Sequence, residues 1–149
     1  MQDNEASSNE PLIKIEDLSI DFKTEESTVR AVKNVSFDIP RGKTIGLVGE
    51  SGSGKSVTSL AIMGLIPSPP GIVSSGKILF QGEDLLTYSQ KQMHKIRGNK
   101  ITMIFQDPMT SLNPVFKVGS QVMESLILHK KMSKKEAREK TIELMVKVG

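Results

Sequence analysis

Apolar and polar residues alternate near the start of the chain, as they do in a strand that buries one face. The apolar positions between residues 12 and 22 are Ile13, Ile15, Leu18, Ile20 and Phe22. The parity of this pattern changes at Glu16-Asp17, which predicts a bulge or bend in the strand. A charged turn over residues 24–28 follows, and a second alternation over residues 35–39 predicts another strand.

Four further stretches carry short apolar runs. Residues 44–48 and 101–105 are mostly apolar and only five residues long, so each predicts a buried strand. Residues 57–66 predict a helix with an apolar face, and residues 77–80 predict a further strand. The Pro-rich segment 67–71 separates these two elements, because proline ends a helix.

Three helices are predicted in the second half of the chain. Ser89 and Gln92 have the spacing of a capping box for a short helix that ends near Gly98, and Ser133 and Glu136 repeat this spacing. Residues 118–129 predict the helix between them, with Val122, Leu126 and Ile127 on its inner side. The last helix carries Ala137, Thr141, Leu144, Met145 and Val148 on one face, with Gly149 at its C-cap.

The order of these elements predicts an α/β fold in which antiparallel strands precede a parallel α/β unit and two helices follow. At 149 residues the chain is one domain or a piece of a larger one. Residues 1–10 are polar and acidic, which predicts a disordered tail and does not fit an export signal. The longest mostly apolar stretch, 57–66, is far shorter than the roughly 20 residues that span a bilayer. We therefore expect a soluble chain whose membrane role, if any, comes through a partner.

Composition narrows the possible functions. The net charge is +3 with basic and acidic residues interleaved, and the chain has no Trp and one Tyr, so no nucleic-acid partner is expected. The chain has no Cys, which excludes a disulfide framework or a thiolate metal site in this stretch. One dense basic cluster consists of Lys130, Lys131, Lys134 and Lys135. It is interpreted as a solvated helix junction rather than a binding patch.

The segment between the predicted strand 44–48 and the predicted helix 57–66 matches the phosphate-binding pattern G-x-x-x-x-G-K-[ST]. Its residues are Gly49, Glu50, Ser51, Gly52, Ser53, Gly54, Lys55 and Ser56. Glycines let backbone N–H groups converge on a β-phosphate at the positive end of the helix dipole. Lys55 would reach the β- and γ-oxygens, and the Ser56 hydroxyl would ligate Mg²⁺. This nucleotide-binding loop is favoured over a glycine-rich turn that merely caps a helix.

Hydrolysis also requires an acidic residue at the end of a second apolar strand. The candidate strand 101–105 leads into Gln106, Asp107 and Pro108 and is interrupted by Thr102. Asp107 is therefore a poor candidate for the metal-holding acid. A neutral amide at Gln106 better suits contact with water or metal, the alternative being a polar strand cap.

Two segments together resemble the ATP-binding subunits of ABC transporters. They are the loop 49–56 and the later run Phe105-Gln106-Asp107-Pro108-Met109-Thr110-Ser111-Leu112-Asn113-Pro114. The particular residues of these two segments, together with Leu60-Ala61-Ile62-Met63-Gly64-Leu65, resemble the dipeptide, oligopeptide and nickel importer branch of the family. The resemblance extends over about residues 12–149. The resemblance implies a P-loop NTPase core with an antiparallel β layer and the start of a helical subdomain, in an N-terminal part of the nucleotide-binding domain over residues 11–149.

The resemblance also implies roles and partners. Phe22 matches the aromatic residue that stacks on adenine, although it would also suit packing in the core. Gln106 matches the glutamine that contacts Mg²⁺ and the attacking water. The implied cofactors are ATP and Mg²⁺. The implied partners are a second ATP-binding subunit, membrane permease subunits that meet the helices over 118–148, and indirectly an extracellular substrate-binding protein. The implied location is peripheral, at the cytoplasmic face of the membrane.

The family's signature motif, its second acidic strand with a catalytic glutamate and its switch histidine do not occur in these residues. His94 and His129 fall on helical stretches and are expected to be exposed. The chain therefore resembles the N-terminal half of an ABC ATPase and is expected to bind ATP without turning it over. Uncovered apolar edges such as Ile45 and Val48 predict a marginal, aggregation-prone fragment. A non-catalytic remnant remains an alternative.

A different P-loop protein, a GTPase or a small-molecule kinase, is the other alternative. Asn99-Lys100-Ile101-Thr102 partly matches a guanine-reading Asn-Lys-x-Asp box. Thr102 stands where the guanine-pairing carboxylate is required, so this alternative lacks its decisive residue.

Overall fold

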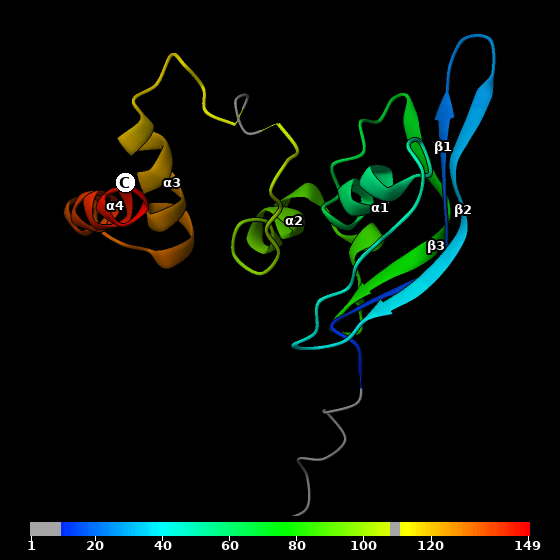
Figure 1. Cartoon of the computed structure of the whole chain (residues 1–149), viewed down its shortest axis with the longest axis horizontal. Helices are drawn as coiled ribbons and strands as arrows, with labels where there is room; N and C mark the ends of the chain where they lie inside the picture. The colour runs from blue at the N-terminus through cyan, green and yellow to red at the C-terminus, as the bar shows by residue number, and fades with distance from the viewer. Residues whose placement is uncertain (1–9, 108–110) are drawn as a thin grey trace, which may run out of the picture. The chain divides into compact units, whose positions relative to one another are not determined.

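The computed structural model describes residues 10–107 and 111–149 (Figure 1). The chain divides into two units, residues 1–93 and residues 94–149, and each is described by itself. The tail predicted over residues 1–10 lies outside the described residues except for Glu10, and so do Pro108, Met109 and Thr110 of the later motif.

The first unit is built on a four-stranded sheet in the order β2-β1-β3-β4, with all pairs antiparallel (Figure 1). The strands are β1 (Ile13–Lys23), β2 (Thr28–Ile39), β3 (Gly71–Phe80) and β4 (Glu83–Asp84). The predicted strands 35–39 and 77–80 are therefore the ends of longer ones. Strand β1 lies between β2 and β3, and the most deeply buried side chains of the unit belong to β1 and β3. They are Ile15, Leu18, Ile20 and Ile78.

The predicted irregularity at Glu16-Asp17 is confirmed. The register of β1 against β2 shifts between Ile15 and Leu18, and Asp17 has a positive φ of 46°. Aspartate tolerates this left-handed conformation better than most residues. The opposing strand β3 supplies Gly76, where a Cβ would lie 2.5 Å from the carbonyl oxygen of Glu16. The bulge therefore depends on a close backbone approach that only glycine permits.

The helical elements of this part of the chain are α1 (Lys55–Ile62), the 3₁₀ helix η1 (Leu85–Thr87) and α2 (Gln90–Ile96), which crosses the boundary between the units. The capping box at the start of α2 is confirmed. The Ser89 backbone N–H donates to Oε1 of Gln92 at 2.9 Å, and the Gln92 N–H donates to Oγ of Ser89 at 3.4 Å. The helical segments contribute the buried residues Thr58, Ala61, Leu85, Met93 and Ile96.

The buried strands predicted over residues 44–48 and 101–105 are wrong. Residues 43–50 form no regular structure, and residue 101 makes only an isolated bridge to Arg97. Val48 is 94% exposed and Ile104 is 95% exposed. A strand needs a paired neighbour for its backbone N–H and C=O groups. In the described part of the chain neither segment pairs with another strand, so the predicted parallel α/β unit does not form.

In the second unit, α3 (Val118–Lys130) and α4 (Lys134–Val148) pack against each other (Figure 1). The Ser133–Glu136 capping box is confirmed, with distances of 2.8 Å and 3.3 Å for its two hydrogen bonds. Ala137 and Thr141 are buried as predicted. Four other residues predicted to face inward are exposed: Ile127, Leu144, Met145 and Val148. Two helices alone share one narrow seam, which covers fewer positions than the apolar pattern offers.

Among the described residues, no helix combines the length and the apolar character that crossing a bilayer requires.

Candidate phosphate-binding site

The loop over residues 49–54 turns the chain into the first residue of α1. Gly52 has a φ of 81° and Gly54 has a φ of 88°, and Gly54 is the N-cap of the helix. A hydrogen bond of 3.2 Å from the N–H of Ser53 to the carbonyl of Glu50 closes the turn. These two left-handed positions explain the glycines at 52 and 54, because other residues adopt this conformation at a cost.

Two glycines of the loop also permit close contacts. A Cβ on Gly54 would lie 2.6 Å from the carbonyl oxygen of Ala31 in β2. A Cβ on Gly49 would lie 2.7 Å from Oγ of Ser53. The first contact sets the loop against the antiparallel sheet, and the second folds the loop onto itself.

The Lys55 side chain folds back over the loop. Its Nζ donates to the carbonyl of Gly49 at 2.7 Å, to the carbonyl of Glu50 at 2.6 Å and to Oγ of Ser53 at 3.2 Å. These acceptors use all three protons of the ammonium group. Lys55 thus places a full positive charge at the loop and holds the two sides of the loop together.

The start of α1 offers backbone donors. The first helical hydrogen bond runs from the N–H of Thr58 to the carbonyl of Gly54 at 2.8 Å, and the Thr58 hydroxyl donates to the same carbonyl at 2.9 Å. The N–H groups of residues 55–57 precede this bond, as is usual for the first turn of a helix. They lie at the positive end of the helix dipole, which favours an anion.

A cavity of about 130 Å³ opens at this point and is lined by Ala31 and residues 52–57. This is about four times the volume of one water molecule in the liquid. Ser56 lies at the cavity and is exposed, and its hydroxyl makes no hydrogen bond within the described residues. Amide donors, one ammonium group and one open hydroxyl are the groups that a magnesium-bound polyphosphate requires. The residues present therefore fit this ligand.

Phe22 lies near the end of β1, paired with Val29 of β2 and Gly71 of β3. It is half-buried, and its Cε1 would lie 3.1 Å from a Cβ on Gly71. One edge of the ring thus packs in the sheet. The role of Phe22 in holding adenine stays a prediction.

Gln106 belongs to the second unit, whereas Phe22 and the loop 49–56 belong to the first. The prediction that Gln106 ends a buried strand is wrong, because residues 102–105 form no strand and Gln106 is exposed at a bend. In the described structure this segment has no neighbouring strand that would pair with it and bury it. The contact of Gln106 with metal and water stays a prediction. His94 is exposed as expected, whereas His129 is half-buried.

Sequence reasoning missed two residues of this site. Ala31 lines the cavity and sets the loop against β2, and Thr58 fixes the carbonyl of Gly54 through its hydroxyl. The signal for Ala31 was the β-branched residues on either side of it, since Val29 and Val32 favour a strand that starts before residue 35. A threonine one turn into a helix carries no comparable signal, because its hydroxyl bonds backward in many helices.

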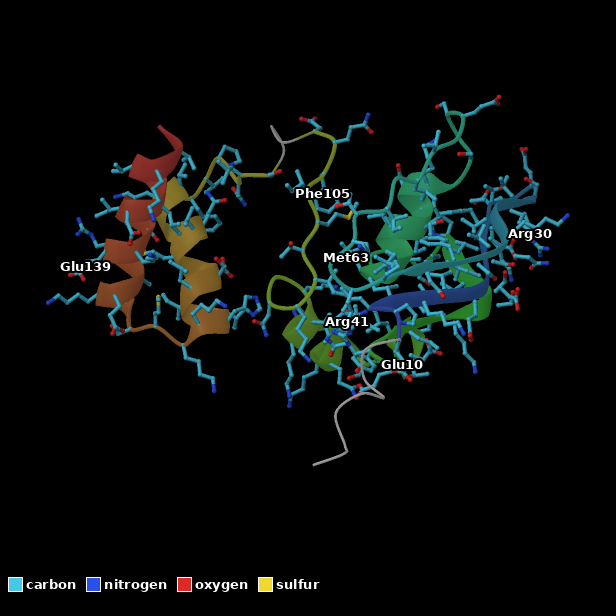
Figure 2. The ribbon with its side chains drawn as sticks, turned by 60° about the horizontal axis from the view of Figure 1, so that its bottom comes forward. Glu10, Arg30, Arg41, Met63, Phe105 and Glu139 are labelled. Atoms are coloured by element: carbon cyan, nitrogen blue, oxygen red, sulfur yellow. The ribbon has the colours of Figure 1, made fainter. Side chains whose placement is uncertain are left out.

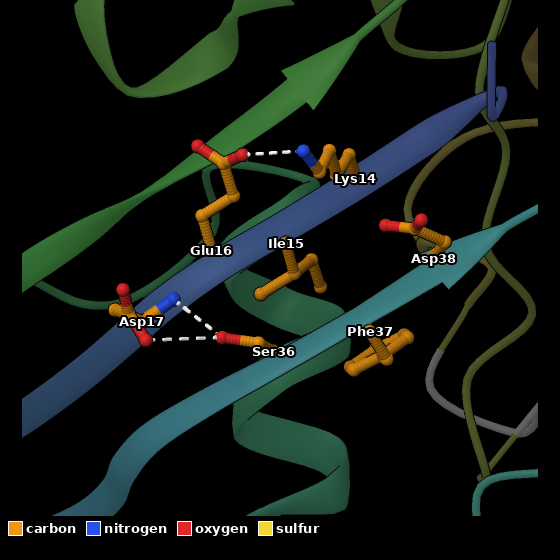
Figure 3. A pocket seen from close by; sticks show the side chains of 7 residues that line it. All are labelled: Lys14, Ile15, Glu16, Asp17, Ser36, Phe37 and Asp38. Carbon is orange, nitrogen blue, oxygen red and sulfur yellow. Dashed lines mark hydrogen bonds and ion pairs between the residues drawn. The ribbon is translucent and has the colours of Figure 1, made fainter.

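A larger cleft lies over the β1 bulge (Figure 3). It measures about 620 Å³ and is lined by Lys14, Ile15, Glu16, Asp17, Ser36, Phe37 and Asp38. Lys14 forms an ion pair of 2.7 Å with Glu16, and this hydrogen bond lowers the pKa of the Glu16 carboxyl. Ser36 Oγ accepts from the Asp17 N–H at 2.8 Å and donates to Oδ1 of Asp17 at 3.2 Å. These polar groups stabilise the bulge, so we assign the cleft a structural role.

Comparison with known proteins settles the family. The sequence profile described as "ABC transporter" matches residues 32–149. The chain belongs to the ABC transporter family. It is 54% identical over 138 residues to the oligopeptide transport ATP-binding protein OppD of Bacillus subtilis (strain 168), covering 93% of this chain and 38% of that protein. It is 51% identical to the dipeptide transport ATP-binding protein DppD of the same strain, covering 94% of this chain and 42% of that protein.

A third relative is the dipeptide transport ATP-binding protein DppD of Escherichia coli (strain K12). It is 46% identical to this chain over 138 residues, and the match covers 42% of its length. The chain thus spans about two fifths of the length of these relatives. Among solved structures, the ATP-binding cassette MJ0796, in a dimeric post-hydrolysis state bound to ADP and Pi, matches with a TM-score of 0.74 and 27% identity. The match covers 88% of this chain and 54% of MJ0796. This match confirms the ABC-ATPase fold class expected from the sequence, although the parallel strands expected within it do not form in the described residues.

Proposed function

We propose that this chain is the P-loop part of an ATP-binding subunit in an ABC importer, which couples ATP binding and hydrolysis to uptake of peptides. The observation that carries the proposal is the loop 49–54, which delivers Lys55 and free amide donors to the start of α1. The relatives described above are named for oligopeptide and dipeptide transport, which supports a peptide cargo. Nickel, the other cargo implied by the sequence, has no support among them.

The residues of the loop have separate roles in binding Mg-ATP. The amides of residues 52 and 54–57 donate to phosphate oxygens, and the Lys55 ammonium neutralises charge on the β- and γ-phosphates. The Ser56 hydroxyl is the magnesium ligand that the loop supplies. Bound Mg²⁺ supplies charge neutralisation across the phosphates. Phe22 holds the adenine ring, and Gln106 contacts the metal and orients water.

The partners follow from the same proposal. MJ0796 is described as a dimer, which supports a second ATP-binding subunit as one partner. Membrane permease subunits are the other direct partner, and an extracellular substrate-binding protein acts through them. The subunit is then peripheral, at the cytoplasmic face of the membrane.

Displacement of a fluorescent ATP analogue tests the proposal. ATP should displace the analogue at least as well as GTP, because no residue of the site reads guanine. Lys55→Ala should weaken binding at least tenfold, since a charge-assisted hydrogen bond contributes roughly 1.5–3 kcal/mol. Lys43→Ala removes an exposed lysine outside the loop and serves as the matched control. Full affinity in Lys55→Ala, or a strong preference for GTP, would contradict the proposal.

A further inference from the structure

Four lysines surround the turn that joins α3 to α4. We call Lys130, Lys131, Lys134 and Lys135 the lysine turn. All four side chains are exposed, and within the described residues none of them forms an ion pair. The turn itself is well defined, because Lys131 caps α3 in the left-handed conformation and Ser133 caps α4. Four lysines within six residues are therefore carried on a defined backbone turn.

The nearby carboxylates offset this charge only in part. Glu136 follows Lys135 directly and offsets one of the four charges, because its carboxylate stays ionised while it accepts from the N–H of Ser133 at 2.8 Å. Glu143 accepts from both Lys140 and Lys147 at 2.7 Å. Glu143 also lies eight residues from Lys135, or about 12 Å along a helix, beyond the Debye length of roughly 8 Å at physiological salt. Its charge is largely screened from the turn.

One more carboxylate, Glu139, lies a single helical turn beyond Lys135. It projects outward from α4 (Figure 2) and makes no ion pair among the described residues. Glu136 and Glu139 together could offset two of the four positive charges. The lysine turn therefore keeps a positive potential toward solvent, which attracts a surface that carries many negative charges.

Exposed apolar side chains stand beside this charge. Leu128 is 64% exposed and Ile127 is 42% exposed, both in the last turns of α3. Lysines next to exposed aliphatic residues are typical of segments that rest on a membrane surface, where the charges meet headgroups and the apolar groups enter the boundary region.

The sequence alone favoured a solvated helix junction at these four lysines. From the exposed lysines, which form no ion pair in the described structure, and the apolar side chains beside them, we propose instead that the lysine turn binds the anionic headgroups of a lipid bilayer. An acidic peptide would need a groove to be held in one register. Neither of the two cavities described above is lined by residues of the turn. A bilayer needs no groove, because its headgroups move laterally to meet the lysines. Each lysine near an anionic surface contributes about fivefold in affinity, so four of them give strong, salt-sensitive binding.

The test measures partitioning of the whole chain onto vesicles by co-sedimentation. Vesicles of phosphatidylcholine with about one third phosphatidylglycerol should retain the chain at low salt, in line with the charge attraction above. Phosphatidylcholine vesicles and raised salt should release it. Replacing all four lysines of the turn by glutamine should lower the partition coefficient at least tenfold, as the contribution per lysine requires.

The matched control replaces four dispersed, exposed lysines by glutamine: Lys33, Lys43, Lys91 and Lys100. It has the same net charge and should retain most of the binding. Equal loss in both quadruple variants would overturn the proposal, because net charge would then suffice. A lysine-turn variant that partitions onto vesicles as strongly as the wild-type chain would also overturn the proposal. Binding of polyglutamate without binding of vesicles would point to an acidic protein partner instead. None of these readouts depends on nucleotide, so failure here leaves the proposed ATP site untouched.

Discussion

Gly54 and Ala31 approach so closely that a Cβ on Gly54 would lie 2.6 Å from the Ala31 carbonyl oxygen and 3.0 Å from Cγ2 of Val32. Gly54 begins the helix that presents Lys55, whereas Ala31 lies in β2 of the antiparallel sheet. Backbone atoms cannot give way as a flexible side chain can. The sheet therefore determines where the phosphate-binding loop can lie.

This contact makes Gly54→Ala a severe change. The new Cβ meets a carbonyl oxygen, and φ of 88° strains any other residue, so we expect loss of Mg-ATP affinity together with about 1–3 kcal/mol of stability. Gly52→Ala is the matched control, because Gly52 has a similar φ of 81° and open space around its Cβ position. Urea denaturation and nucleotide titration of both variants separate the cost of backbone strain at positive φ from the cost of the steric clash with the Ala31 carbonyl. Equal effects would contradict the role of Ala31.

A second prediction concerns Asp21, which is 7% exposed and accepts from Arg30 Nε at 2.8 Å and from Nη2 at 3.3 Å. The hydrogen bond from Arg30, followed by one from Ser74, lowers the pKa of the Asp21 carboxyl. A lowered folded-state pKa stabilises the fold above the unfolded pKa of about 3.9, and this stability is lost as pH falls through the folded value. The difference in thermal midpoint between wild type and Asp21→Asn should therefore be larger at pH 7 than near pH 3. A difference in thermal midpoint that is the same at both pH values would contradict the stabilising role of the ionised Asp21 carboxylate.

Glu143 gives a prediction in the second unit. Its two lysine partners lower the pKa of the Glu143 carboxyl to about 2. The stabilisation is present above pH 4.5, the ordinary value, and should fade as pH drops toward 2. Because the three side chains are largely exposed, salt should weaken the effect.

Helix content measured by circular dichroism at several pH values checks this, with Glu143→Gln as the variant. Glu139→Gln removes the same charge from a carboxylate without an ion pair in the described structure and is the control. Equal loss of helix content in both variants would show that the Lys140–Glu143–Lys147 cluster does not stabilise the helix.

Several sequence predictions were confirmed because local chemistry decides them. The change of parity at Glu16-Asp17 marks a real bulge, and both capping boxes form, since each depends on residues within four positions of one another. The loop 49–56 was also recognisable, because Gly52 and Gly54 adopt a positive φ that other residues adopt only at a cost.

The rest depends on distant partners that local patterns do not contain. Val48 and Ile104 have the character of strand residues, yet a run of apolar residues becomes a strand only beside a neighbour. Ala31 contributes to the site through its carbonyl and its position, which its side chain does not reveal. Ile127 and Val148 continue an apolar helix face beyond the seam that two helices can cover.

Val48 gives the fourth prediction. Since it is 94% exposed, Val48→Ser should change the stability of the isolated chain by less than about 0.5 kcal/mol and should raise the concentration at which the chain aggregates. Leu18→Ser is the contrasting variant, because Leu18 is fully buried and its loss should cost about 3 kcal/mol or more. Static light scattering and urea denaturation measure both effects. A large loss of stability in Val48→Ser would show that residues 44–48 are packed in solution.

The most direct test of the central claim is amide hydrogen exchange along the chain with and without Mg-ATP. If the loop holds the triphosphate, hydrogen exchange of the amides of residues 52 and 54–57 should slow at least tenfold on addition of nucleotide, because each becomes a donor to a phosphate oxygen. The same amides should stay unchanged in Lys55→Ala. Protection that appears elsewhere, with residues 52 and 54–57 unaffected in the wild-type chain, would contradict the account.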